Sequence, residues 1–84
     1  MLDSLVYFRI NSLKEFFHTA KVLSAYLNRD ILEDFSKRYY ADVRIIELFN
    51  NVYVSFYSDY CPNNPSRFIT SSDLLKQIFN DPNN

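Results

Sequence analysis

Two adjacent asparagines, Asn50 and Asn51, constrain this chain more than any other feature, because the sequence contains no glycine. A two-residue type I′ turn needs a positive φ at both central positions, and asparagine tolerates this conformation better than most residues. The segments on either side of the pair are rich in β-branched and aromatic residues, which favour strands. The pattern therefore predicts a β-hairpin over residues 43–60.

A two-residue turn would also fix which hairpin residues lie opposite one another. Counting outward from the turn, the face expected to carry the core receives Val43, Ile45, Glu47, Phe49, Val52, Val54, Phe56 and Ser58. The opposite face receives Arg44, Ile46, Leu48, Tyr53, Ser55 and Tyr57. Glu47 on the core face would need a hydrogen-bond donor or a position at the margin of the sheet.

Residues 5–10 alternate as a strand does, with Val6, Phe8 and Ile10 on one side and Leu5, Tyr7 and Arg9 on the other. An alternative is one long N-terminal helix, because apolar residues also recur at helical spacing through this region. Ser12 and Glu15 favour the strand, since they form a capping-box pattern that begins a helix at the serine. We therefore expect a strand over residues 5–10 and a helix over residues 12–27.

Further capping signals follow the first predicted helix. Asn28 suits the left-handed conformation that ends many helices. Asp30 and Glu33 repeat the capping-box pattern, which predicts a second, shorter helix over residues 31–40.

The last third of the chain is predicted to be a loop followed by a helix. Two prolines and paired asparagines make residues 61–66 a loop. A cluster of Thr, Ser and Asp precedes a third helix over residues 73–79. We expect residues 80–84 to be a frayed tail.

The expected order is β-α-α-β-β-α, in a single domain that spans residues 1–84. If the first strand pairs with the hairpin, the fold is a small two-layer α+β domain, in which a three-stranded, mainly antiparallel sheet carries helices on one face. The alternative is a long N-terminal helix packed on a β-hairpin. In a chain of 84 residues the core is small, so binding to a partner or a second copy would stabilise it.

The residues offer little catalytic machinery. His18, the single histidine, is expected on the partly exposed side of a helix, and the single cysteine, Cys61, has no neighbour in sequence that would activate its thiol. One histidine and one cysteine cannot form a zinc site from protein ligands alone. The lack of glycine argues against the loops that bind nucleotide phosphates. The sequence predicts a non-enzymatic protein without a cofactor or metal.

Charge and hydropathy limit the partners. The chain carries nine basic and ten acidic residues and a net charge of −1, which argues against binding to duplex nucleic acid and against mimicry of it. The N-terminus lacks a basic region, and the apolar stretch at residues 5–10 is short and contains Arg9. We expect a soluble, cytoplasmic protein that does not insert into a membrane.

The outer face of the expected sheet is the strongest candidate for a binding surface, because tyrosine and arginine are enriched at the energetic centres of interfaces. The candidate partner-binding residues there are Tyr7, Arg9, Arg44, Ile46, Leu48, Tyr53 and Tyr57. In another interpretation, the last helix or the loop at residues 61–69 folds over this face and covers it.

The sequence thus predicts a protein-binding module, in the manner of a small inhibitor, immunity or regulatory protein that occupies a surface of a larger protein. Because the expected strands contain neither proline nor lysine, their edges are also suited to pairing with a second copy of the chain. The alternative is a single-stranded nucleic-acid binder that stacks bases on exposed tyrosines. The near-neutral charge weakens that alternative.

Overall fold

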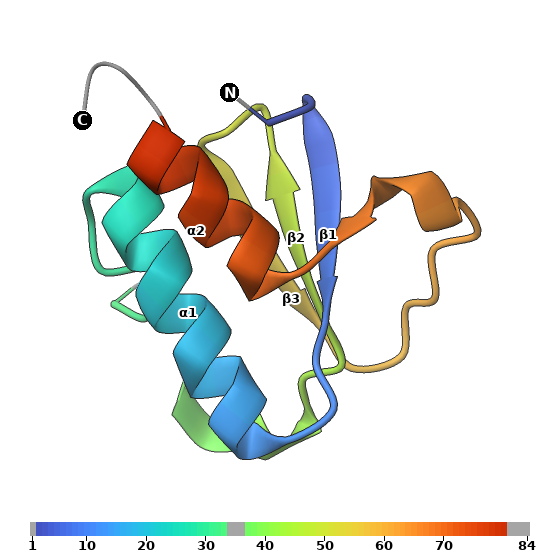
Figure 1. Ribbon diagram of the computed structural model, residues 1–84. Coiled ribbons are helices and arrows are strands. Elements are labelled where there is room, and N and C mark those ends of the chain that lie inside the picture. Colours follow the sequence, from blue (N-terminus) through green and yellow to red (C-terminus); the bar gives the residue numbers. More distant parts are fainter. Residues whose placement is uncertain (1, 34–36, 81–84) are drawn as a thin grey trace.

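The computed structural model describes residues 2–33 and 37–80 and shows a two-layer α+β fold (Figure 1). Within these residues, one layer is a mixed sheet of four strands in the order β3-β2-β1-β4. Helices α1 and α2 form the other layer and cover one face of the sheet (Figure 1). The strands are β1 (Leu5–Arg9), β2 (Ile45–Phe49), β3 (Tyr53–Tyr57) and β4 (Phe68–Ile69), and the helices are α1 (Leu13–Leu27) and α2 (Ser71–Asn80). Two 3-10 helices, η1 (Lys37–Asp42) and η2 (Pro65–Arg67), lie in the connections.

The first strand and first helix are present where the sequence predicts them, so the alternative of a long N-terminal helix is wrong. The Ser12 hydroxyl oxygen accepts a hydrogen bond from the Glu15 amide at 3.1 Å, as a capping box requires. At the other end of α1, Asn28 adopts the left-handed conformation with φ 56° and ψ 42°. The cap at Ser12 separates the helix from β1 and leaves the preceding residues extended.

The second predicted helix, over residues 31–40, does not form as one α-helix. Residues 31–33 make a turn, residues 34–36 lie outside the described part of the chain, and residues from Lys37 onward form η1. The Asp30 side chain caps this turn by accepting a hydrogen bond from the Leu32 amide at 3.0 Å. Within the described residues, the capping residue Asp30 is followed by a turn over residues 31–33.

The sheet has a fourth strand, so the predicted three-stranded sheet is incomplete. β1 pairs antiparallel with β2, as expected, and on its other side it pairs in parallel with β4. Only Phe68 and Ile69 form β4, between η2 and the start of α2. Two residues are too few to show the alternation by which strands are identified in a sequence.

The hairpin closes at the predicted asparagines, but its register is shifted by one residue. Asn50 and Asn51 have positive φ angles of 54° and 58°. The Val52 amide donates to the Phe49 carbonyl at 3.1 Å, which completes the turn. Strand pairing then places Phe49 opposite Tyr53. Val52 is therefore an extra residue in the loop, where the prediction had placed it in the strand.

This shift moves the side chains of β2 to the opposite faces from those predicted, because side chains alternate along a strand. Ile46 and Leu48 are fully buried in the core, although the prediction placed them on the outer face. Ile45, Glu47 and Phe49 lie on the outer face, although the prediction placed them toward the core. The prediction for β3 is confirmed, since Val54 and Phe56 pack against the core.

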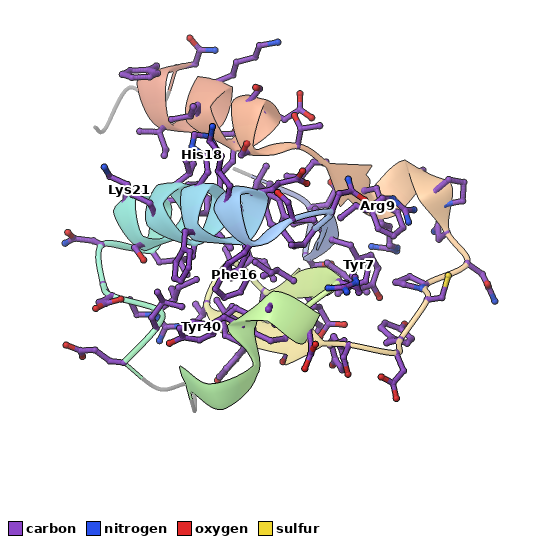
Figure 2. The ribbon with its side chains drawn as sticks, turned by 90° about the horizontal axis from the view of Figure 1, so that it is seen from below. Tyr7, Arg9, Phe16, His18, Lys21 and Tyr40 are labelled. Atoms are coloured by element: carbon purple, nitrogen blue, oxygen red, sulfur yellow. The ribbon has the colours of Figure 1, made fainter. Side chains whose placement is uncertain are left out.

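The core lies between the sheet and the two helices. Its buried residues are Val6, Phe8, Ile10, Phe16, Ala20, Val22, Leu23, Ile31, Val43, Ile46, Leu48 and Leu74. Phe16 points from α1 toward η1 and stacks on Tyr40, with 5.0 Å between the ring centroids (Figure 2). The last helix is longer than predicted, because α2 includes Asn80, the first residue of the expected tail. Residues 81–84 lie outside the described residues.

Candidate partner-binding surface

The outer face of the sheet is the face turned away from α1 and α2. The strand pairings place on it Leu5, Tyr7 and Arg9 from β1, Ile45, Glu47 and Phe49 from β2, Tyr53, Ser55 and Tyr57 from β3, and Phe68 from β4. Five of these ten residues are aromatic. The connection between β3 and β4 covers one half of this face, whereas the half at the hairpin turn is exposed.

The connection between β3 and β4, residues 58–67, covers one half of the outer face. It runs from one edge of the sheet to the other, because β3 and β4 are the two outermost strands (Figure 1). Tyr60 in this connection packs edge-on against Tyr7, with ring centroids 6.0 Å apart, and tilted against Tyr57 at 5.0 Å. The alternative interpretation expected the last helix or the loop at residues 61–69 to cover this face; the residue that contacts it is instead Tyr60, just before that loop, and the last helix lies on the other face of the sheet.

Two residues beneath this connection are buried outside the main core. The solvent-exposed fraction of Tyr7 is only 4%, and that of Ile45 is only 3%. Neither belongs to the buried cluster between the sheet and the helices. They form a second, smaller apolar layer, and Tyr57 and Tyr60 lie on its outer side.

The buried end of Tyr7 is hydrogen-bonded. Its phenolic oxygen lies 3.3 Å from that of Tyr60. This hydrogen bond and, after it, burial of the ring raise the pKa of Tyr7 to about 12. The Tyr7 hydroxyl thus stays neutral over the physiological pH range and acts as a structural group.

Charged residues on this face are held by aromatic neighbours. The Arg9 guanidinium lies over the Phe68 ring, 4.6 Å from its centroid, in a cation–π contact. Glu47 is half-buried, and its Oε1 lies 3.5 Å from the Tyr57 hydroxyl, which donates to it. Its position on the outer face gives Glu47 the donor that a carboxylate in the core would have needed.

The other half of the outer face ends in an exposed apolar cluster at the hairpin turn. We call Phe49, Val52 and Tyr53 the hairpin patch; they are 44%, 49% and 63% exposed. The rings of Phe49 and Tyr53 lie opposite each other on the two strands, with centroids 6.4 Å apart. Beside the patch, β3 pairs only with β2 among the described residues, so its far edge is open.

Three hydrogen bonds made by side chains hold the hairpin turn in place. The Asn51 side chain accepts from the Tyr26 hydroxyl at 2.7 Å and donates to the Leu2 carbonyl at 3.2 Å. The Arg29 guanidinium donates to the Val52 carbonyl. The hairpin patch is therefore fixed to α1 and to the N-terminal segment.

The seven predicted partner-binding residues do not form one surface. Tyr7, Arg9, Tyr53 and Tyr57 lie on the outer face, although Tyr7 is covered. Ile46 and Leu48 lie in the core, so their assignment to a surface was wrong, because the shifted register turns them inward. Arg44 precedes β2, and its guanidinium folds back onto the carbonyls of Ala41 and Val43.

The sequence interpretation missed Phe49, Val52 and Tyr60. Phe49 and Val52 had been placed on the core face, and one additional loop residue reverses that assignment. Tyr60 was predicted to be the last residue of the hairpin, whereas β3 ends at Tyr57, and no local signal shows that Tyr60 packs on a residue 53 positions away.

The residues with catalytic potential are not brought together. His18 is exposed on α1, on the side turned away from η1 (Figure 2). Cys61 is exposed in the connection that covers the opposite layer. Among the described residues, no three His, Cys, Asp or Glu side chains gather closely enough to hold a metal ion.

In the part of the chain that the structure describes, neither helix has the length and apolar character needed to cross a membrane.

Comparison of the chain with protein-family models, with curated proteins and with solved structures finds no match.

Proposed function

We propose that this protein is a non-enzymatic binding module that occupies a surface of a larger protein through the hairpin patch and the open edge of β3. The observation that carries the proposal is the exposure of three large apolar side chains, Phe49, Val52 and Tyr53, at one end of the outer face. A small inhibitor, immunity protein or regulator would act in this way, by covering a surface of its target.

The composition of the patch suits a protein interface. Aromatic residues contribute strongly to binding because they bury a large area at a modest cost in conformational entropy. The Tyr53 hydroxyl adds a hydrogen-bonding group at the rim. Burial of the patch would remove from water apolar area that now faces it, which is the main driving force of association.

The edge of β3 supports the same proposal. Exposed strand edges are usually protected by proline, lysine or a short length. β3 has five residues, Tyr53–Tyr57, and contains neither proline nor lysine. An extended segment of a partner could therefore add to the sheet at this edge, with the side chains of the hairpin patch beside it.

The anchoring of the turn favours tight binding. Ordering a loop during association reduces affinity, so a surface that is fixed beforehand binds more strongly. The hydrogen bonds of Asn51 to Tyr26 and Leu2 fix the turn in this way.

The proposal is tested with Phe49→Ala and Tyr53→Ala, combined in one variant, against a matched control. Phe79→Ala is the control, because Phe79 is also an exposed aromatic residue (81%) but lies at the end of α2, in the helix layer. The tagged wild type captures partners from an extract of the organism that produces the protein, and a captured protein is then purified for binding measurements.

We expect the double variant to bind the purified partner at least about tenfold more weakly, which corresponds to about 1.4 kcal/mol. The Phe79→Ala control should bind as the wild type does. Equal binding by the double variant and the wild type, or loss of binding in the control alone, would overturn the assignment of this surface.

A further inference from the structure

The connection between β3 and β4, residues 58–67, is held on the sheet at two points. Among the described residues, two side-chain hydrogen bonds join it to β1. The phenolic oxygens of Tyr60 and Tyr7 lie 3.3 Å apart, and the Arg67 guanidinium donates to the Leu5 carbonyl at 3.2 Å. One of these attachments lies near each end of the connection, and both depend on a side chain.

Most of this connection faces water. Eight of its ten residues are exposed, and Tyr60 itself remains 44% exposed while it packs on Tyr7. Residues 61–66 project away from the strands (Figure 1). Hydrogen bonds within the connection, such as that from the Ser66 hydroxyl to Asn64 Oδ1 at 2.6 Å, do not involve the sheet. Segments that bury little of their own surface open at a lower free energy than a core does.

The surface beneath the connection adjoins the hairpin patch. On the outer face of β2 and β3, one cross-strand pair, Glu47 with Ser55, separates the hairpin patch from Ile45. Ile45 and Tyr7 are buried at this covered end, with exposed fractions of 3% and 4%. Two apolar regions therefore lie next to each other on one face of the sheet, and one of them is covered.

The exposed region is small for a stable interface. The three side chains of the hairpin patch are between 44% and 63% exposed. Since an aromatic side chain can bury roughly 150–250 Å², the patch offers on the order of 300 Å². A standard protein interface buries about 800 Å² on each partner. A protein that binds the hairpin patch therefore needs neighbouring surface, and the covered region adjoins the patch.

We propose that residues 58–67 are a lid that opens while the rest of the protein stays folded and that, when closed, keeps part of the outer face from contact with the partner. This inference rests on the proposed function, because its partner is the protein that binds the hairpin patch. In the closed state, Tyr60 occupies the surface over Tyr7 and Ile45. In the open state, these two residues extend the hairpin patch. A partner that buries them binds the open state more tightly and shifts the equilibrium toward it.

Thiol labelling tests whether the lid opens separately from the core. In a Cys61→Ser background, Ile45→Cys places a reporter beneath the lid, and Ile46→Cys places a matched reporter in the core. The two positions are neighbours on β2, are 3% and 0% exposed, and lie on opposite faces of the sheet. The rate of reaction with iodoacetamide is measured without urea and at urea concentrations below the unfolding transition of each variant.

We expect position 45 to react at least about tenfold faster than position 46, relative to the rate that global unfolding of each variant allows. The rate at position 45 should also rise less steeply with urea, because opening the lid exposes less surface than unfolding does.

Equal relative rates with equal urea dependence would show that Ile45 becomes accessible only on global unfolding, and would overturn the lid. An Ile45→Cys variant that does not fold would overturn it as well, since the layer beneath the lid would then be inseparable from the core. Val6→Cys, a second core position with 2% exposure, replaces Ile46→Cys if that variant does not fold. These measurements use no partner, so failure of the lid is distinguished from failure of the proposed partner binding.

The affinity for the purified partner tests what the closed lid prevents. Tyr60→Ala removes the aromatic contact of the lid, so this variant should bind at least about threefold more tightly than the wild type, although it is the less stable protein. Asn63→Ala is the control, because Asn63 is an exposed lid residue, and it should bind as the wild type does. Unchanged or weaker binding by Tyr60→Ala, or an equal gain in Asn63→Ala, would overturn the role of the lid in partner binding.

Discussion

The phenolic oxygens of Tyr7 and Tyr60 lie 3.3 Å apart, although 53 positions separate the two residues in the chain. This contact joins β1 to the connection between β3 and β4 and closes a small apolar layer on the outer face of the sheet. A chain of 84 residues has a limited core, so a second layer contributes a substantial part of its stability.

Removal of the Tyr60 side chain is expected to destabilise the fold by about 1–2 kcal/mol, because Tyr60→Ala removes ring contacts with Tyr7 and Tyr57 as well as the hydrogen bond. Tyr60→Phe, which removes only the hydroxyl, should cost about 0.5–1.5 kcal/mol. Both are measured by urea denaturation. Tyr53→Ala serves as the control and should change the free energy of unfolding by no more than about 0.5 kcal/mol, since Tyr53 is 63% exposed. Equal effects at positions 53 and 60 would contradict the second layer.

Tyr7 should make the stability of the protein depend on alkaline pH. Its pKa is raised from 10.0 to about 12 in the folded state by the hydrogen bond to Tyr60 and by burial. Above pH 10 the unfolded chain loses this proton more readily than the folded chain, so the contribution of Tyr7 is complete below pH 10 and is lost as the pH rises toward 12. Urea midpoints measured across this range should fall more steeply for the wild type than for Tyr7→Phe. Parallel curves would show that Tyr7 titrates normally.

The two turn asparagines should respond differently to replacement by glycine. Both have positive φ angles, which glycine adopts readily, so Asn50→Gly should be neutral within about 0.5 kcal/mol. Asn51→Gly should cost about 1–2 kcal/mol, because it removes the side-chain hydrogen bonds to Tyr26 and Leu2. Thermal and urea denaturation of the two variants measure the difference. Identical stabilities would mean that the Asn51 side chain contributes nothing beyond its backbone conformation.

The cap of α2 should weaken in acid. The Asp73 carboxylate accepts hydrogen bonds from the Thr70 amide at 2.9 Å and the Thr70 hydroxyl at 3.0 Å, and the amide bond first and then the hydroxyl bond lower the pKa of Asp73 below its usual value of 3.8. The contribution of Asp73 is therefore present above pH 3.8 and is lost as the pH falls through the lowered pKa. Thr70→Ala should cost about 1 kcal/mol at about pH 7 and less at about pH 2, with Ser72→Ala as a control that changes little. A pH-independent cost would contradict this account of the cap.

The features that the sequence predicts correctly depend on residues close together in the chain. The helix start at Ser12 requires only Glu15, three residues later, and the helix end at Asn28 requires only one residue that tolerates the left-handed conformation. The positive φ angles of Asn50 and Asn51 follow from the same property in a chain without glycine. Such local signals identified α1, β1 and the position of the hairpin turn.

The features that the sequence does not predict depend on single residues or on distant contacts. The composition and the alternation of apolar residues in the hairpin are the same whether Val52 belongs to the loop or to the strand. The position of Val52 nevertheless decides whether Ile46 and Leu48 face the core. The contact of Tyr60 with Tyr7 joins distant parts of the chain, so nothing near either residue indicates it. For these reasons the class of fold was predictable and the composition of the outer face of the sheet was not.

The most direct test of the binding surface is photo-crosslinking in the organism that produces the protein. A benzophenone amino acid replaces Tyr53 in one strain and Phe79 in a matched strain, because both side chains are strongly exposed but lie in different layers. We predict a discrete adduct with another protein from position 53 and none from position 79. Adducts from position 79 alone, or no adduct from position 53, would contradict the proposal that the hairpin patch binds a partner.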